Sequence, residues 1–368
     1  MKKFALRIVV TALLCTISIG LQANAVQADN EAKEEIKLTS AGPIAFGPKG
    51  LLLVSDPMEA TIFAIETGDT EGSTDGVTIA VEDIRAKIAS MMGATAKELR
   101  INDLAVNPIN GTPYLSVTRG SGESEVSTIL TVNPKSKEIS VFELAGKTFT
   151  KTSFTNAAES RRTRGGDQRL QAITDMAFVD GQIYVAGLSN EEFASNLRAI
   201  AYPFSETNNG CSIEIYHGAH GKYETRSPIR TFAAMETGEE INLLAAYTCT
   251  PLVRIPVSDL KPKTKVKGTT IAELGNRNRP LDMVVYKKDD KNYALMANSS
   301  RGVMKIDLAD APTSPEITNR VSGTSGTPYE TIKELSGVMQ LDGLSKTHGV
   351  VLVRDESGKE DLKTIVLP

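Results

Sequence analysis

The chain of 368 residues contains no tryptophan and only three cysteines and three histidines, and aromatic residues make up 5% of it. With so few rings, the core must be built from Val, Ile, Leu, Ala and Met. The chain has no G-x-S-x-G, no P-loop, no dinucleotide-binding glycine motif and no CxxCH. The usual sequence signals for a serine hydrolase, a nucleotide-binding domain or a c-type cytochrome are therefore missing.

One apolar run stands at the start of the chain, and no later segment is long enough to cross a membrane, so we expect no membrane insertion. Lys2, Lys3 and Arg7 precede an uncharged stretch over residues 8–21, and small residues then offer cleavage after residue 25 or 28. This pattern is typical of a secretory signal peptide over residues 1–28. It predicts a periplasmic or secreted protein that consists of residues 29–368.

The charge balance argues against a nucleic-acid partner. The formal net charge is −4, and loss of Lys2, Lys3 and Arg7 with the signal peptide would make it −7. A mildly acidic chain is not attracted to nucleic acids or anionic membranes. The expected partners are therefore small molecules or other proteins.

A repeated phrase dominates the rest of the sequence. An apolar strand, a turn rich in Gly or Asp, and a second apolar strand ending in small polar residues recur six times, starting at Ile44, Leu104, Met176, Phe232, Met283 and Val338. Repeats of this length without an internal helix are typical of propeller blades. The sequence predicts an all-β fold, a single six-bladed β-propeller domain with four strands per blade.

The ring must be closed, because an open sheet edge invites aggregation. The last blade shows only three strands, so we expect the N-terminal strand at residues 35–40 to pair with it, and residues 77–81 to complete the first blade. Two insertions follow: a short helix containing Ile84 and Ile88, and a long polar loop at residues 146–171. Both connect the outer strand of one blade to the inner strand of the next, which places them on one side of the disc, here called the upper face.

The first candidate site is a pair of histidines, His217 and His220, in the sequence YHGAHG. Imidazoles are common zinc and copper ligands, and Cys249 is expected on the same face, so a two-histidine, one-thiolate metal site is one interpretation. The alternative is that the histidines only cap a loop. Because the expected strands separate Cys249 from Cys211 by more than disulfide distance, both thiols should be free. His348 is expected on the opposite face, in a structural role.

A second candidate is formed by Asp103, Asp175 and Asp282, which occupy equivalent positions at the top of three innermost strands. Three carboxylates at the mouth of a channel could hold Ca²⁺. The alternative is structural: each aspartate would accept a hydrogen bond from the backbone of the neighbouring blade.

A third candidate is cationic and lies in three loops expected on the upper face. Guanidinium groups suit carboxylates and phosphates, so these loops could bind an anionic small molecule or an acidic protein partner. Solvated loop charge is the alternative interpretation. The residues are Arg161, Arg162, Arg164, Arg169, Arg277, Arg279 and Arg301.

The phrase FGPKGLLLVSD…IFAIE resembles the repeat of NHL-type propellers and of the gluconolactonase group. The stretches GLSNEEFAS, YHGAHGKYETRSPIRTF, YTCTPLVRIPVSDLKP and ELGNRNRPLDM are more similar to a group of exported bacterial propellers without an assigned activity. The gluconolactonase resemblance implies a divalent cation at the channel mouth, held by Glu, Asn and Asp, with Asp282 matching the Asp. The first strand here begins Gly42-Pro43 and has no such Glu.

These observations favour an exported scaffold that binds a ligand or a protein through its upper face; they establish no cofactor, and a divalent metal (Zn, Cu or Ca) is the candidate. A metal-dependent hydrolase of the lactonase type is the second hypothesis. An accessory protein of a periplasmic redox enzyme is the third.

Overall fold

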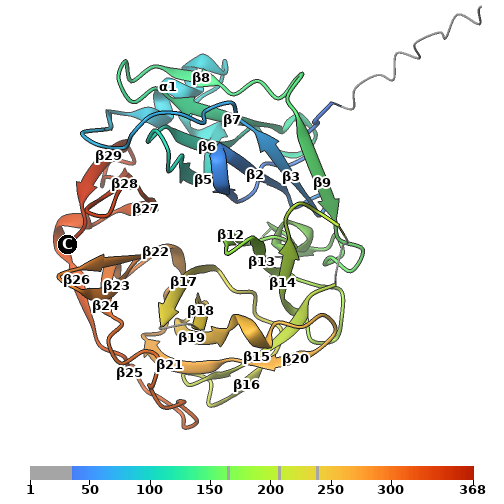
Figure 1. Cartoon of the computed structure of the whole chain (residues 1–368), viewed down its shortest axis with the longest axis vertical. Helices are drawn as coiled ribbons and strands as arrows, with labels where there is room; N and C mark the ends of the chain where they lie inside the picture. Colours follow the sequence, from blue (N-terminus) through green and yellow to red (C-terminus); the bar gives the residue numbers. More distant parts are fainter. Residues whose placement is uncertain (1–34, 164–165, 206–208, 238–239) are drawn as a thin grey trace, which may run out of the picture. The chain divides into compact units, whose positions relative to one another are not determined.

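The computed structural model describes residues 35–163, 166–205, 209–237 and 240–368, and these form six mainly antiparallel blade sheets set radially around a central channel (Figure 1). The prediction of a six-bladed propeller is confirmed. The predicted signal peptide at residues 1–28 and Arg164 lie outside the described residues. Within the described residues, no helix is long and apolar enough to span a membrane.

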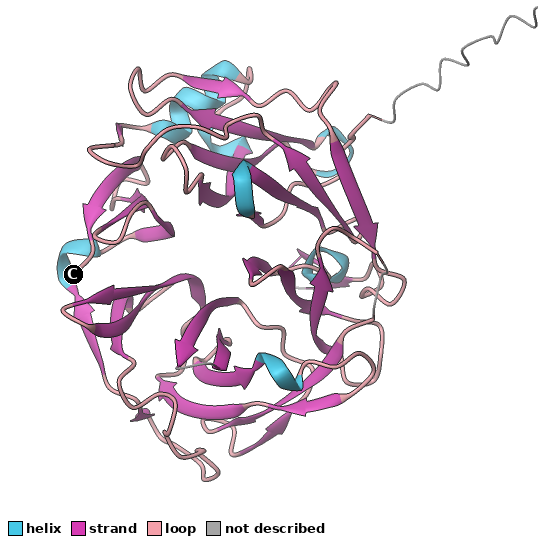
Figure 2. Ribbon diagram, in the orientation of Figure 1, coloured by secondary structure: helices cyan, strands magenta, loops and turns pink. Residues whose placement is uncertain are grey.

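Strands make up nearly all of the regular structure (Figure 2), and each blade is numbered by the position of its innermost strand in the sequence. Blade 1 contains β1 (Ile44–Phe46), β2 (Leu51–Asp56), β3 (Thr61–Glu66) and β9 (Phe149–Ser153). Blade 2 contains β5 (Leu99–Val106), β6 (Pro113–Arg119), β7 (Val126–Val132) and β8 (Ile139–Val141). Blade 3 contains β12 (Asp175–Val179), β13 (Gln182–Leu188), β14 (Ser195–Ala201), β15 (Cys211–His217) and β16 (Lys222–Glu224), with β20 (Lys265–Lys267) parallel to β15.

The remaining three blades follow in sequence. Blade 4 contains β17 (Thr231–Thr237), β18 (Glu240–Ala246), β19 (Pro251–Pro256), β21 (Thr269–Leu274) and β25 (Thr324–Gly326). Blade 5 contains β22 (Pro280–Lys288), β23 (Lys291–Asn298), β24 (Gly302–Asp307) and β26 (Tyr329–Ile332). Blade 6 contains β27 (Val338–Gly343), β28 (His348–Arg354), β29 (Glu360–Val366) and β4 (Ala80–Val81).

The blades are not arranged in sequence order. The buried apolar residues form six clusters among the described residues, and each cluster joins two neighbouring blades. Their membership gives the ring order 2–1–3–4–5–6, with blade 6 packed against blade 2. Blade 2 therefore sits between the first and the last blade, as the upper part of Figure 1 shows.

This order changes how the ring closes, and the predicted closure by residues 35–40 is wrong. The outer strand of blade 6 is β4, paired as Val81 with Leu362 and Ala80 with Lys363. The same segment had been expected to complete blade 1, where β9 stands instead. Residues 35–40 form no strand. Ile36 packs instead into the apolar cluster between blades 1 and 2, and not at the edge of blade 6 that it was expected to cover.

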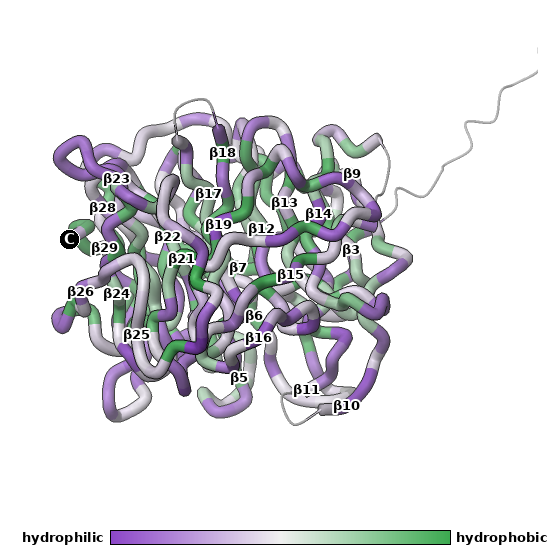
Figure 3. The backbone as a smooth tube through the Cα atoms, turned by 90° about the horizontal axis from the view of Figure 1, so that it is seen from below, coloured by the Kyte–Doolittle hydropathy of each residue, from purple (hydrophilic) through white to green (hydrophobic). Residues whose placement is uncertain are grey.

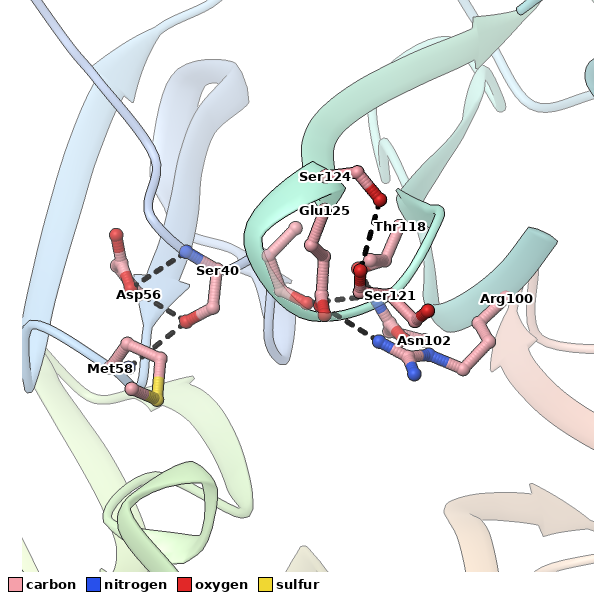
Figure 4. A network of polar contacts seen from close by, with 10 residues as sticks. Ser40, Asp56, Met58, Arg100, Asn102, Thr118, Ser121, Ser124 and Glu125 are labelled. Carbon is pink, nitrogen blue, oxygen red and sulfur yellow. Dashed lines mark hydrogen bonds and ion pairs between the residues drawn. The ribbon is translucent and has the colours of Figure 1, made fainter. Parts of the chain in front are cut away.

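The segment that leads into β1 is fixed by hydrogen bonds to one carboxylate. Ser40 donates to Asp56 from its backbone nitrogen at 3.0 Å and from its hydroxyl at 2.6 Å, and the hydroxyl accepts from the Met58 nitrogen at 2.9 Å (Figure 4). This arrangement holds residues 39–43 over the upper face.

Both insertions reach the upper face. The expected helix is α1 (Ile84–Met91), with Ile84, Ile88 and Ala89 buried between blades 6 and 2. The polar loop carries the hairpin of β10 (Arg162–Thr163) and β11 (Gly166–Asp167), which projects beyond the blades at the bottom of Figure 3. Short 3-10 turns join the strands: η1 (Pro48–Gly50), η2 (Ala96–Glu98), η3 (Gly122–Ser124), η4 (Gln168–Gln171), η5 (Val257–Asp259) and η6 (Lys333–Leu335).

Blade 5 is completed only after a long excursion of the chain, by β26. The chain leaves β24, runs along the outside of blade 4 as β25, and returns as β26 to complete blade 5. On this excursion the Val321 nitrogen donates to the Gly218 carbonyl at 2.9 Å, so the excursion touches the loop that contains the two predicted histidine ligands.

Candidate metal centre on the upper face

The two histidines lie in the tight hairpin between β15 and β16. The Gly221 nitrogen donates to the His217 carbonyl at 2.8 Å, and Gly221 has φ +67°, a conformation that glycine adopts without strain. The hairpin turns the chain back within four residues. His217 is thereby brought face to face with His220, with the ring centroids 3.8 Å apart.

Cys249 approaches from the next blade, in the turn between β18 and β19. Cys249 and Thr250 have φ values of +66° and +62°, which cost about 1–2 kcal/mol for each residue other than glycine. The turn is held by the Cys249 nitrogen, which donates to the Asn278 carbonyl at 2.8 Å, and by the Thr250 hydroxyl, which donates to the Gly275 carbonyl at 2.7 Å. Blade-to-blade bonds therefore stabilise a strained turn that presents the thiol.

The three side chains meet as the sequence predicted. One ring nitrogen of His217, one of His220 and Sγ of Cys249 all lie within 4.8 Å of one another. Zinc bonds of about 2.0–2.3 Å would place tetrahedral ligands about 3.3–3.6 Å apart, so only small side-chain adjustments are needed. His217 is buried, whereas the His220 side chain is 47% exposed and can make such an adjustment.

Glu224, on β16, orients both imidazoles. Its two carboxylate oxygens contact Nδ1 of His217 at 2.9 Å and Nδ1 of His220 at 2.7 Å. A carboxylate on one ring nitrogen is the usual arrangement behind a histidine ligand, because it fixes the tautomer and leaves Nε2 to bind the metal. Nε2 of His217 is buried and has no hydrogen-bond partner among the described residues.

The charge state of this group suits metal binding. Burial lowers the pKa of His217, with the contact to Glu224 opposing this effect only in part. Burial works to raise the pKa of Glu224, but the hydrogen bonds with His217 and His220 outweigh it, so that this pKa is lowered. At neutral pH the group therefore has an ionised carboxylate and a neutral imidazole at His217, the form that binds metals.

A second carboxylate, Glu273 on β21, supports the loop between the histidines. It is buried and accepts a hydrogen bond from the Gly218 nitrogen. Burial raises the pKa of Glu273 to about 7. A Cβ at Gly218 would lie 2.9 Å from both Cγ and Oε1 of Glu273, so glycine is required there.

The two cysteines of the described chain are both free, as expected. Cys211 is buried and donates to the Leu197 carbonyl at 3.3 Å, and burial raises the pKa of its thiol to about 12. Cys249 is half-buried, so it is the thiol available to a ligand. His348 starts β28, and its Nδ1 contacts the Thr347 hydroxyl at 2.9 Å, away from the metal cluster.

The aspartates make the blade-to-blade hydrogen bonds of the structural interpretation. Asp103 accepts from the Ile44 nitrogen at 2.7 Å, Asp175 from Phe232 at 2.7 Å and Asp282 from Leu341 at 2.8 Å. Around the ring these aspartates lie on every second blade. Each one accepts a hydrogen bond from a backbone N–H in the first strand of the next blade. They therefore connect the blades in pairs.

The aspartates also form a ring of perturbed carboxyls with Asp342, which accepts from the Val106 nitrogen at 2.7 Å. Burial raises the pKa of Asp175 to about 7 and that of Asp342 to about 6. Burial also raises the pKa of Asp103 and of Asp282, with the neighbouring carboxyls adding to it.

The residues at this ring do not fit the cation that the gluconolactonase resemblance implies. Oδ1 and Oδ2 of Asp282 each accept a backbone N–H, from Met283 at 2.8 Å and from Leu341 at 2.8 Å. The first strand has Pro43 where a Glu ligand would be needed. We therefore derive no chemistry from a metal at this position.

The predicted arginines do not converge on one site. Arg169 donates to the carbonyls of Met58 at 2.9 Å and Ala158 at 3.2 Å, which is a structural role. Arg161 and Arg162 are exposed on the hairpin. Arg277 and Arg301 line a separate hollow with Asn276 and Ser300, and of the predicted arginines that the structure describes, only Arg279 reaches the mouth of the channel.

Two functional candidates were not found from the sequence. Glu224 follows His220 by four residues. A carboxylate this close to a pair of histidines was the sequence feature that could have indicated its contact with both rings. Arg230 directly precedes the first strand of blade 4, just as Arg279 directly precedes that of blade 5.

Comparison with known proteins gives distant matches. No family model and no curated protein matches the chain. Among solved structures, the PQQ-bound aldose sugar dehydrogenase of Streptomyces coelicolor shares 12% identity and a TM-score of 0.39, covering 90% of this chain and 96% of its own. Drosophila Semaphorin 1b shares 10% identity and a TM-score of 0.39, and the match covers 91% of this chain and 88% of that protein's chain. A protein assigned as a gluconolactonase shares 9% identity and a TM-score of 0.32, and the match covers 89% of each chain. Likenesses this distant transfer no activity.

Proposed function

We propose that this propeller is a metal-binding scaffold whose upper face holds one zinc or copper ion between His217, His220 and Cys249. The observation that carries the proposal is the convergence of the three ligand atoms within 4.8 Å. The buried, unpartnered Nε2 of His217 supports it, because a metal would satisfy a group whose burial is otherwise costly. Two imidazoles and one thiolate suit zinc or copper better than calcium, which prefers oxygen ligands.

The test is metal analysis of the mature protein purified without chelators. We expect one equivalent of zinc or copper, lost in His220→Ala and in Cys249→Ser. The His220 side chain is exposed and Cys249 lies in a turn, so these variants should fold. His348→Ala is the control, and it should keep the metal. A wild-type protein that binds neither ion after reconstitution would overturn the proposal.

A metal-dependent hydrolase is the second candidate, and exposure of the site favours it. His220 is largely accessible to solvent, so an ion held by three protein ligands would keep a fourth position open. An ion of that kind activates water for hydrolysis. Turnover of a panel of lactones and esters that is lost both with a chelator and in Cys249→Ser would support this activity. Turnover that persists in the variant would place the activity elsewhere.

Export through the predicted signal peptide is part of the proposal. In an oxidising compartment a half-buried thiol is exposed to oxidation, and metal ligation would protect it. The role beside a periplasmic redox enzyme stays a prediction.

A further inference from the structure

The upper mouth of the channel is a polar cleft. A cleft of about 510 Å³ adjoins a smaller pocket of about 140 Å³. Both are lined by Pro43, Asn102, Thr174, Arg230 and Arg279. The β10–β11 hairpin contributes Gly166 and Asp167 to the rim of the larger one.

Most polar side chains of the rim are already paired. On the side of blade 2, Arg100 forms an ion pair with Glu125 at 2.8 Å, and the Asn102 amide donates to the Thr118 hydroxyl at 2.7 Å (Figure 4). On the side of blade 3, the Thr174 hydroxyl donates to the Ile229 carbonyl at 2.7 Å. These groups shape the cleft without offering free charge.

The two arginines on the opposite side differ. No carboxylate of the described residues forms an ion pair with Arg230 or Arg279. Arg230 is half-buried, and its Nε donates to the Thr248 hydroxyl at 3.2 Å. Burial and the neighbouring charge of Arg279 lower the pKa of Arg230 to about 10. Asp103, Asp175 and Asp282 line the smaller pocket beside the two arginines, but burial raises the pKa of all three carboxyls, and none of them forms an ion pair with Arg230 or Arg279.

Two guanidinium groups held near each other repel, and the chain as a whole is acidic, with a formal charge of −4. A local excess of positive charge on an acidic protein, placed at the opening of a cavity, is suited to attract an anion. The planar donors of arginine match the oxygens of a carboxylate or a phosphate. The volume admits a small molecule and not a folded partner.

We propose that Arg230 and Arg279 bind a small molecule with a carboxylate or phosphate group at the mouth of the channel. This goes beyond the metal site, since none of the three metal ligands lines the mouth cleft. The two sites are close along the chain. Arg230 bonds Thr248, which precedes Cys249, and the Cys249 nitrogen bonds the carbonyl of Asn278, which precedes Arg279.

The experiment is calorimetric titration of the mature protein with inorganic phosphate and with succinate, at constant ionic strength because salt screens exposed charges. The variants are Arg230→Gln and Arg279→Gln. Arg162→Gln is the matched control, because it removes an exposed arginine of the same face that does not line the cleft. We expect at least one probe to bind, and each mouth variant to weaken it about tenfold or more.

Binding that Arg162→Gln weakens as much as Arg279→Gln would overturn the proposal, because it would reflect general attraction to the face. So would the absence of binding of both probes to the wild type at millimolar concentration. Arg279→Lys separates geometry from charge and should regain only part of the affinity. Repeating the titration with Cys249→Ser, which should bind the probe like the wild type, distinguishes failure of this site from failure of the metal site.

Discussion

The imidazole rings of His217 and His220 lie 3.8 Å apart at an interplanar angle of 37°, and each directs Nδ1 to one oxygen of Glu224. Two charged imidazoles in such contact would repel each other, and the charge of His220 contributes to lowering the pKa of His217. This arrangement favours the neutral form of the His217 imidazole, whose Nε2 has no hydrogen-bond partner among the described residues and is free for a ligand.

The first prediction concerns that carboxylate. Glu224→Gln keeps the size of the side chain but has one acceptor oxygen instead of two, so at least one of the two rings loses its fixed tautomer. We expect metal affinity to fall about 10- to 100-fold, measured by competition with a chelating dye. Glu214→Gln, which breaks a surface ion pair between Glu214 on β15 and Lys265 on β20, is the control and should bind like the wild type. Equal loss in both variants would contradict the role given to Glu224.

The second prediction concerns Gly218. Gly218→Ala would push a methyl group against Glu273, so we expect a loss of about 1–3 kcal/mol in the free energy of unfolding, together with weaker metal binding. Gly343→Ala is the matched control, because a Cβ there meets no atom within 4 Å. Chemical denaturation of the two variants gives the comparison, and an unaltered Gly218→Ala protein would show that the loop adapts.

The third prediction concerns ring closure by β4. Val81 is 3% exposed, whereas its neighbour Ala80 is exposed on the other side of the strand. Val81→Asp buries an unpaired charge between blades 6 and 2 and should cost about 3–5 kcal/mol, whereas Ala80→Asp should cost little. Melting temperatures of the two variants test this. Similar values would mean that β4 does not hold the ring together.

The fourth prediction concerns the channel carboxyls. Asp175 has a pKa of about 7 in the folded protein and a lower one when unfolded, so the folded state binds the proton more tightly. The resulting stabilisation is present at pH 4 and is lost as the pH rises towards 7, at up to about 1.4 kcal/mol per pH unit. Asp175→Asn should make the free energy of unfolding fall less steeply between pH 4 and 7, whether or not the variant is less stable at pH 4. The exposed control Asp259→Asn should leave the decline unchanged in denaturation curves taken from pH 4 to 8.

The fifth prediction distinguishes the two thiols. Cys211 is buried with a raised pKa and Cys249 is half-buried, so brief alkylation of the native mature protein should modify Cys249 alone. Bound zinc should block that reaction, and denaturation should expose both thiols. Mass spectrometry reads the adducts directly, and rapid native labelling of Cys211 would be inconsistent with the packing of blade 3.

The sequence was enough to predict the blades because each strand alternates or runs apolar according to the faces it buries. The same register predicts that His217, His220 and Cys249 lie on one face. It could not give Glu224 a role, because an acidic residue in a short hairpin looks like any solvated charge until its geometry is seen.

The order of the blades was beyond the sequence for another reason. Alternation shows which face of a strand is buried but not which sheet it joins, and the two residues of β4 carry almost no pattern. The expected N-terminal strand at residues 35–40 had the right alternation, yet Ile36 found its apolar contacts between blades 1 and 2. Arg230 was missed because one arginine before a strand is common in any loop.

The pairing of β4 with β29 has a consequence for the newly made chain. The Ile79 nitrogen donates to the Thr364 hydroxyl across 285 residues of sequence. During synthesis this segment has no partner until β29 has been made, while blade 2 already has all its own strands. Truncation near residue 360 would therefore leave an open edge in the middle of the molecule and not at its end. Strand β29 therefore decides whether the newly made protein is a sealed ring or a species that aggregates.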